Sequence, residues 1–194
     1  SYPDVVDMQS LDDVFEGVGV FDIFFSAMDL GDEPVTVTGE SVSQSLLPMP
    51  GVEAVVGRAF LPAEEAPGSA IPVAIVSYEY WRKNGEDPDL VGKTLRVNSQ
   101  VLSIVGIAPR FFTGRTAILS PELYLPLGMH HLLMNDMSRD SDQMLDDRAN
   151  HRLFVVGRLR PGLTYDEADS QLAVVASRMA DAFPSINGDQ TFTV

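Results

Sequence analysis

The period of the hydrophobic pattern changes along the first 43 residues and predicts a helix followed by a β-hairpin. Residues 3–13 place apolar side chains at helical spacing after Pro3, which suits a first helical turn. The run VGVFDIFFSAMDL at 18–30 is rich in β-branched and aromatic residues, which favours a strand. After the turn sequence GDEP, residues 35–43 alternate with the period of a half-buried strand. The two strands are expected to form a hairpin.

A boundary between subdomains is expected where the middle of the chain begins. Residues 46–72 are rich in proline and glycine, which prevents long regular elements. VAIV at 73–76 then predicts a buried strand, and Ser77 is suited to cap a short helix after it. Two further strands, at 95–97 and 101–105, are separated by a turn sequence. The middle is therefore expected to hold a strand, a helix and a second hairpin.

The C-terminal part returns to clear periodicity after residues 128–150, which show none and are expected to form a short helix or a mobile excursion. HRLFVVGRL at 151–159 predicts a strand. Thr164 and Glu167 have the spacing of a capping box at the start of an amphipathic helix. TFTV at 191–194 is expected to begin a last strand. The fold class is α+β: a split unit formed by the two ends of the chain, with the middle as an insertion.

Composition and net charge limit the kinds of partner that this chain is expected to bind. The chain has 194 residues and a formal net charge of −15, so its average surface repels nucleic acid and anionic lipid headgroups. It has no cysteine, which removes disulfides and thiolate metal sites. No apolar run approaches the roughly 20 residues that cross a bilayer. The abrupt sequences at both ends are those expected of a soluble piece of a longer protein, whose membrane anchor would lie outside it.

The stretch GEDPDLVGKT at 85–94 ends like a nucleotide-binding loop. Such a loop needs a glycine five residues before its Gly-Lys pair, but Asp87 stands there, and Pro88 lies inside the supposed loop. A helical pattern precedes the stretch, and the alternating TLRVN follows it, the reverse of the required order. We interpret it as a helix exit and a turn into a hairpin.

Other candidate chemistry is weak. Aspartates cluster between residues 136 and 147, and hard cations prefer such ligands. They are Asp136, Asp140, Asp142, Asp146 and Asp147. The EF-hand spacing is absent, so a solvated acidic loop is preferred and cation binding stays open. His130 and His131 are adjacent and would diverge, and no zinc or esterase motif is present. The sequence therefore predicts no catalytic residue, no metal site and no cofactor, and it does not indicate an enzyme.

Two groups of residues are candidates for contact with a partner or an apolar ligand. Trp81 lies with two tyrosines on the predicted short helix, where aromatic packing onto a sheet is the alternative explanation. The other group is methionine-rich, and flexible thioethers suit adaptable contacts. Its members are Met129, Met134, Met137 and Met144. They form either a partner-facing loop or a small satellite core.

The order of several stretches resembles the MacB-like periplasmic core domain of ABC transporter permeases of the MacB and FtsX type, especially permeases without an ATPase domain in the same chain. The stretches are SYPDVVDMQ, FEGVGVF, GVEAVVGRAFLPAEE, VAIVSYEYWRKNGEDPDLVGKTLRVNSQVLSIVGIAPRFF, ELYLPL, HRLFVVGRLRPGLTYDEADSQL and AFP. They cover most of the chain outside 128–150. Asn84 and Ser99 depart from the usual motif at turn positions, and Gly92 and Gly106 would mark turns.

The resemblance implies an extracytoplasmic, periplasmic domain between two transmembrane helices of a permease. Residues 1–52 and 150–194 would form a porter-like α/β subdomain, and 53–149 an inserted mixed α/β, sabre-like subdomain. The expected function is non-catalytic: transmission of conformational change across the membrane, with contact to substrate or partner proteins. The implied partners are the flanking transmembrane helices, a cytoplasmic ATPase subunit acting indirectly, and a twin permease domain or a periplasmic adaptor. The alternative is an extracytoplasmic module that binds an apolar ligand or peptide.

Overall fold

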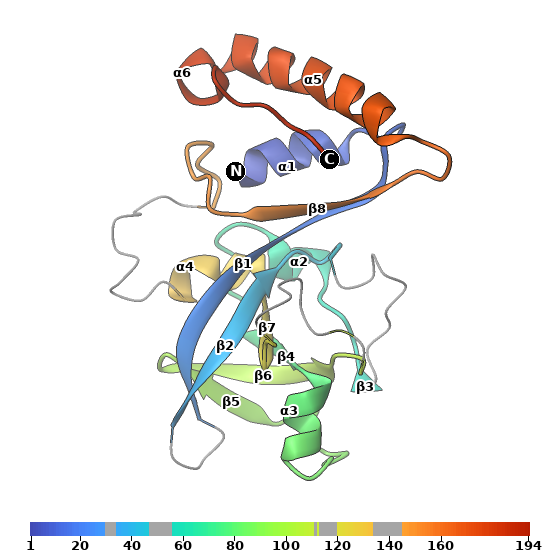
Figure 1. The fold of residues 1–194 in the computed structure, drawn as a ribbon. Helices are drawn as coiled ribbons and strands as arrows, with labels where there is room; N and C mark the ends of the chain where they lie inside the picture. Colours follow the sequence, from blue (N-terminus) through green and yellow to red (C-terminus); the bar gives the residue numbers. More distant parts are fainter. Residues whose placement is uncertain (30–33, 47–55, 111, 113–119, 134–144) are drawn as a thin grey trace.

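One helix lies near the start of the chain and two lie near its end, with the strands and several short helices between them (Figure 1). The computed structural model describes residues 1–29, 34–46, 56–110, 112, 120–133 and 145–194. The helices are α1 (Tyr2–Gln9), α2 (Pro62–Glu65), α3 (Tyr78–Lys83), the 3₁₀ helix η1 (Leu127–Met129), α4 (His130–Leu133), α5 (Tyr165–Ala182) and α6 (Pro184–Asn187). The strands are β1 (Phe15–Asp29), β2 (Val35–Val42), β3 (Val56–Gly57), β4 (Val73–Val76), β5 (Thr94–Val97), β6 (Gln100–Ile107), β7 (Leu123–Pro126) and β8 (Phe154–Leu159).

The predicted local elements are largely confirmed. β1 and β2 form the expected antiparallel hairpin, and so do β5 and β6. Ser77 caps α3 by accepting a hydrogen bond from the Tyr80 amide. At α5, the Thr164 hydroxyl accepts from the Glu167 amide, and the Glu167 carboxylate accepts from the Thr164 amide. Each of these signals is local in sequence, which is why the pattern alone identifies it.

Six strands close into a ring that we call the barrel. The order of pairing is β2, β7, β4, β6, β5 and β1, and β1 pairs again with β2. The β2–β7 and β4–β6 pairs are parallel, whereas the other pairs in the ring are antiparallel. Closure satisfies the backbone groups that an open sheet leaves at its edges. The part of β1 that belongs to the barrel runs from Phe21 to Asp29.

Two hydrophobic clusters lie on opposite faces of β4, whose four residues are all buried. Ala74 and Val76 face the larger cluster, and Val73 and Ile75 face the smaller one. The larger cluster consists of Met28, Val37, Ala74, Val76, Leu90, Leu95, Val97, Leu102, Ile104, Ile107, Leu123, Leu125 and Met129. Because both faces of β4 are covered, its run of apolar residues has no polar alternation.

What we call the upper layer consists of α1, β1 from Phe15 to Phe21, β8, α5, α6 and the residues up to Val194. β8 pairs with β1 antiparallel, and the two chain ends lie in this layer beside the helices (Figure 1). A third apolar cluster lies beneath α1 and includes Val5, Met8 and Val18. β1 is thus one continuous strand shared by the upper layer and the barrel.

Three expectations differ from the structure. The first helix ends at Gln9 rather than at residue 13. Ser10 is its C-cap, and the Ser10 hydroxyl donates a hydrogen bond to the Asp7 carbonyl. TFTV at 191–194 is not a strand: the Val194 amide donates to the Asp169 carboxylate, so this tail is held by a side chain of α5. Gly106 does not mark a turn.

Gly106 lies inside β6, opposite Gly57 of β3. A Cβ atom on Gly106 would lie 2.4 Å from the Arg58 carbonyl oxygen, closer than real Cβ atoms approach other atoms. Glycine is therefore needed at this position for the close approach of two backbones rather than for a turn.

The division into 1–52 with 150–194 and 53–149 stays a prediction. The backbone pairing crosses it, because β1 and β2 supply two strands of the barrel whose other four strands come from residues 53–149. Sequence periodicity finds the strands but not this pairing between distant segments.

Candidate functional site

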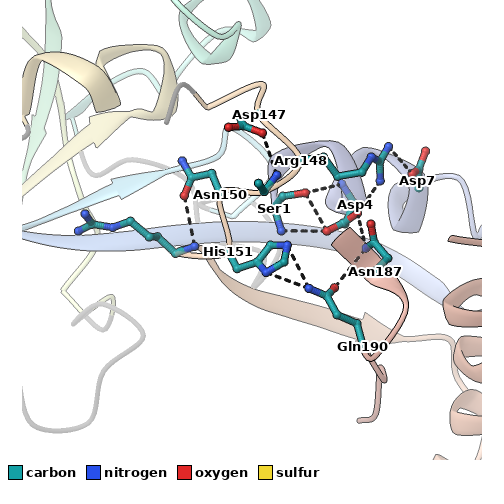
Figure 2. A network of polar contacts seen from close by, with 11 residues as sticks. Ser1, Asp4, Asp7, Asp147, Arg148, Asn150, His151, Asn187 and Gln190 are labelled. Atoms are coloured by element: carbon teal, nitrogen blue, oxygen red, sulfur yellow. Dashed lines mark hydrogen bonds and ion pairs between the residues drawn. The ribbon is translucent and has the colours of Figure 1, made fainter. Parts of the chain in front are cut away.

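A network of polar side chains joins the N-terminal helix to the C-terminal helices, and its centre is Asp4 (Figure 2). Asp4 is 2% exposed. Its carboxylate accepts hydrogen bonds from the Ser1 hydroxyl at 2.7 Å and from the Asn187 side-chain amide at 3.2 Å. It also forms an ion pair with Arg148. Residues far apart in the sequence therefore converge on one buried carboxylate.

The local sequence places Asp4 there. Ser1 is the N-cap of α1, and Asp4 is the third helical residue of a capping box. A carboxylate at this position also interacts favourably with the positive end of the helix dipole. Burial by itself raises the pKa of Asp4. Hydrogen bonds from the Ser1 hydroxyl and amino group and from Arg148 outweigh it, so the pKa is lowered.

Arg148 is the second centre of the network. Its guanidinium also binds Asp7 at 3.0 Å and lies 4.1 Å above the centre of the Phe183 ring. Asp7 belongs to α1, whereas Phe183 lies at the C-terminal end of α5. A planar guanidinium can pair with carboxylates and stack on an aromatic ring simultaneously, which a lysine does less well. Arg148 thus connects the segment before β8, residues 145–153, to both α1 and the end of α5.

The network continues through the turn after α5. The Asn187 amide donates to Asp4 and to the Gln190 side-chain oxygen, each at 3.2 Å. The Gln190 amide nitrogen lies 2.9 Å from Nδ1 of His151. Asn187 is 1% exposed, and its Oδ1 atom has no hydrogen-bond partner among the described residues. Side-chain hydrogen bonds and ion pairs thus link the segment before β8, α1 and α6.

A cleft of about 660 Å³ lies beside this network, between β8, α1, α5 and the C-terminal tail. Its apolar lining includes Met8, Phe15, Leu153, Leu172 and Phe192. Its polar lining includes Asp4, His151 and Gln190. The arrangement offers an apolar wall with hydrogen-bonding groups at one side.

Of the residues predicted to contact a partner, Trp81 and Met129 both pack in the larger barrel cluster. Trp81 is half-buried on α3, packs against the larger barrel cluster and donates its ring N–H to the Asp87 carbonyl at 2.8 Å. Met129 is fully buried in that same cluster, so in this structure it packs the core and offers no surface to a partner. Met134, Met137 and Met144 lie outside the described residues.

The apparent nucleotide loop is a connector, as its sequence predicts. α3 ends at Lys83 and β5 begins at Thr94, so a helix precedes the stretch and a strand follows it. Gly92 has a φ of +96°, a turn conformation that glycine adopts without strain. Lys93 pairs with Asp87, its neighbour in the same loop. The lysine is therefore engaged within its own connector.

The acidic segment is only partly described. Asp136, Asp140 and Asp142 lie outside the described residues, while Asp146 and Asp147 lie within them. Over the described ranges, no three histidine or acidic side chains are grouped so as to hold a metal ion. Within the same ranges, no helix has the length and apolarity that a bilayer span requires.

Sequence reasoning missed the network itself. Asp4 and Asp7 give a local signal, since acidic residues suit a helix N-terminus. Nothing in the sequence pairs them with Arg148 or Asn187, which lie 144 and 183 residues from Asp4. Only the fold brings these groups together.

Solved structures of three other proteins share the fold of this chain. The periplasmic region of MacB from Actinobacillus actinomycetemcomitans matches with a TM-score of 0.66 and 11% identity, over 98% of this chain and 83% of that one. The extracellular domain of the noncanonic ABC-type transporter YknZ from Gram-positive bacteria matches with a TM-score of 0.62 and 14% identity, over 94% and 83%. A domain of a putative permease from Porphyromonas gingivalis matches with a TM-score of 0.60 and 19% identity, over 95% and 73%. The fold is that of the extracytoplasmic domains of ABC-type permeases.

The family follows from the sequence comparison. The family model for the MacB-like periplasmic core domain matches residues 1–175. The chain therefore belongs to the MacB-like periplasmic core domain family and is a periplasmic domain of a membrane permease. No curated protein sequence matches it as a relative.

Proposed function

We propose that this domain transmits conformational change between the membrane and the extracytoplasmic side of an ABC-type permease, without catalysing a reaction itself. The observation that carries the proposal is β1, one continuous strand of 15 residues that belongs to both parts of the molecule. Phe21 is paired with Phe154 of β8 on one side and with Val42 of β2 on the other. A displacement applied to the upper layer would therefore reach the barrel through a hydrogen-bonded strand.

The position of the chain ends supports this direction of coupling. Both ends lie in the upper layer, away from β5 and α3 (Figure 1). Flanking transmembrane helices, the partners we propose, would then pull on the upper layer first. A cytoplasmic ATPase subunit would act through those helices. The barrel would be free to contact substrate, a twin permease domain or a periplasmic adaptor.

A cross-linking experiment in the complete permease tests the proposal. The chain has no native cysteine, so introduced cysteines react alone within it. Asp7→Cys with Arg148→Cys, joined by a short bismaleimide, would fix α1 to the segment before β8. We expect this cross-link to lower ATP hydrolysis by the permease and its ATPase partner several-fold, compared with the same variant before cross-linking.

The matched control joins two residues that are already paired within one hairpin. Phe25 and Thr38 are directly opposite in the β1–β2 hairpin. Phe25→Cys with Thr38→Cys, oxidised to a disulfide, should leave ATP hydrolysis nearly unchanged. Equal effects from the two cross-links, or no effect from either, would contradict the proposed transmission.

The cleft favours a second candidate function, the binding of an apolar ligand. Its volume of about 660 Å³ lies in the range of small-molecule sites, and much of its lining is apolar. Native mass spectrometry of the purified chain separates the two candidates. A co-purified apolar molecule that is lost in Leu172→Glu supports ligand binding, whereas the bare mass of the chain argues against it.

A further inference from the structure

The short helix α2 lies between the upper layer and the barrel (Figure 1), and Glu64 fixes it on the barrel side. The guanidinium of Arg58 binds both carboxylate oxygens of Glu64, at 2.7 and 3.0 Å, and the Leu61 amide donates to the same carboxylate at 2.7 Å. Arg58 is itself held by β6, because its backbone amide donates to the Val105 carbonyl at 2.9 Å. The Glu64 side chain is 4% exposed, so its charge depends on this bidentate contact.

The next residue, Glu65, binds different partners. Its Oε1 atom accepts from the Tyr2 hydroxyl at 3.2 Å, and its Oε2 atom accepts from the Gln44 amide at 2.7 Å. Tyr2 is the first residue of α1 and packs against the cluster beneath that helix, whereas Gln44 follows β2. One carboxylate thus binds an element of the upper layer and the end of a barrel strand.

The end of α2 also packs closely against η1. A Cβ atom on Gly128 would lie 2.4 Å from the Glu64 carbonyl oxygen and 2.9 Å from that of Ala66, closer than real Cβ atoms approach other atoms. The Ala70 amide donates to the Gly128 carbonyl at 3.2 Å. Glycine at this position therefore allows the two backbones to touch, and a side chain would separate them.

η1 in turn contacts both parts of the molecule. Leu127 packs in the cluster beneath α1, whereas Met129 packs in the larger barrel cluster, and both are fully buried. Because α2 and η1 contact each other and each reaches both parts, they form one connection, which we call the α2 bridge: residues 61–70 and 127–129. It is separate from β1 and from the polar network around Asp4.

We propose that the α2 bridge is a second route by which movement of the upper layer reaches the barrel, in parallel with β1, and that Glu65 is its positioning residue. A displacement of α1 would move Glu65 through Tyr2. The backbone of α2 would carry the displacement to Glu64 and from there to Arg58 beside β6. The consequence for transport rests on the proposed function, but coupling across the bridge is a property of the chain itself. Its failure would leave transmission through β1 standing.

A double-mutant cycle between the two ends of the bridge tests this coupling in the purified chain. Tyr2→Phe removes the hydroxyl that binds Glu65. Arg58→Lys keeps a positive charge beside Glu64 but lacks the planar fork that binds both oxygens. The two residues bind different carboxylates, so independent sites would give additive losses of stability.

Coupling across the bridge predicts a smaller combined loss, because detaching one end leaves less to lose at the other. The equilibrium constant for unfolding of the double variant, measured in urea, should fall at least about threefold below the additive value. Additive losses would overturn the proposal.

The matched control changes another arginine–glutamate pair. Arg82 pairs with Glu79 on α3, which lies far from the upper layer (Figure 1). Tyr2→Phe and Arg82→Lys should be additive within about twofold. Non-additivity of the same size in both cycles would mean that the bridge does not carry the coupling, and would also overturn the proposal.

Native-state hydrogen exchange of the wild type keeps the test valid if a variant does not fold. The amides of Gln44, Leu61 and Ala70 each donate to a group of the bridge. If the bridge opens as one unit, their protection should agree within about threefold and should fall together as urea is added. A larger difference in protection, or a separate dependence on urea, would show that α2 stays on the barrel when its contact with the upper layer opens, and would reject the bridge.

Discussion

The barrel and the upper layer are stabilised in different ways. In the barrel each of the six strands pairs on both sides, and buried aliphatic and aromatic side chains fill two clusters. In the upper layer β8 lies at the end of the strand order, and Val155 and Tyr165 are exposed. Its helices are joined by Asp4, Arg148 and Asn187. Apolar packing therefore dominates the barrel, whereas the upper layer combines a smaller apolar cluster with polar contacts between distant segments.

This difference has a mechanical consequence. Hydrophobic burial is non-directional, so apolar contacts in the barrel core do not depend on one particular angle. A large shift of the core side chains would expose apolar surface to water and would be unfavourable. Ion pairs and hydrogen bonds require particular distances and angles, so the upper layer has discrete contacts that can break and re-form. In the proposed transmission of conformational change, the contacts of the upper layer would be the ones that break and re-form.

The largest effect is expected in the barrel core. Leu95→Ala removes a side chain that is 2% exposed in the larger cluster, and should lower the free energy of unfolding by about 2–5 kcal/mol. Val101→Ala, on the facing strand but 51% exposed, is the control and should cost less than about 0.5 kcal/mol. Urea unfolding followed by circular dichroism measures both. Similar losses for the two variants would show that the barrel core does not dominate stability.

The next effect is expected at the centre of the polar network. Asp4→Asn keeps the shape of the side chain but leaves the Arg148 guanidinium without its buried partner, and should cost about 2–3 kcal/mol. Asp7→Asn removes the more exposed partner of the same arginine and should cost less than about 1 kcal/mol. Urea unfolding compares them at pH 7. A larger loss for Asp7→Asn would contradict the assigned centre.

The contribution of the Asp4 carboxylate to stability should depend on pH in the acid range. Because the pKa of Asp4 is lowered on folding, its contribution is present above the unfolded value of 3.8 and is lost as the pH falls through the lower folded value. The stability difference between the wild type and Asp4→Asn should therefore shrink when unfolding is measured from pH 5 down to pH 2.5. A difference that grows on acidification would show that the pKa is raised instead.

A smaller effect is expected at the start of α5. Thr164→Ala removes the hydroxyl that accepts a hydrogen bond from the Glu167 amide. It should lower the free energy of unfolding by about 1 kcal/mol. Ser170→Ala, inside the same helix, removes a hydroxyl bonded to the Asp166 carbonyl and should be nearly neutral. Thermal unfolding by calorimetry distinguishes them. Equal midpoints for Thr164→Ala and the wild type would mean that the cap does not stabilise the helix.

The smallest effect is spectroscopic. Burial, the negative charge of Glu65 and a hydrogen bond to it raise the pKa of Tyr2 to about 12. Absorbance at 295 nm should show a late tyrosine step that Tyr2→Phe removes, whereas Tyr165→Phe, at a 71% exposed position, should leave that late step in place. Because the folded pKa lies above the unfolded value of 10, the Tyr2 contribution is lost as the pH rises from 10 through 12. An unchanged late step in Tyr2→Phe would assign it elsewhere.

Local signals in the sequence identified most elements. The caps at Ser77 and Thr164 and the alternation of β2 depend on residues a few positions apart, so the pattern alone places them. The same logic failed for 191–194, where the run TFTV suggested a strand but the tail has a side-chain partner on α5. Strand formation needs a neighbouring strand, and four residues cannot specify one.

The sequence by itself determined the periodicities, the caps, the turn in place of a nucleotide loop, and the order of motifs that marks the family. Only the tertiary structure decided that β1 serves two layers, that Met129 is core, and that Asp4 meets Arg148 and Asn187. The physical reason is the range of the interactions. Helical and strand patterns are set by neighbours along the chain, whereas barrel closure and buried ion pairs depend on groups that approach only when distant segments pack together.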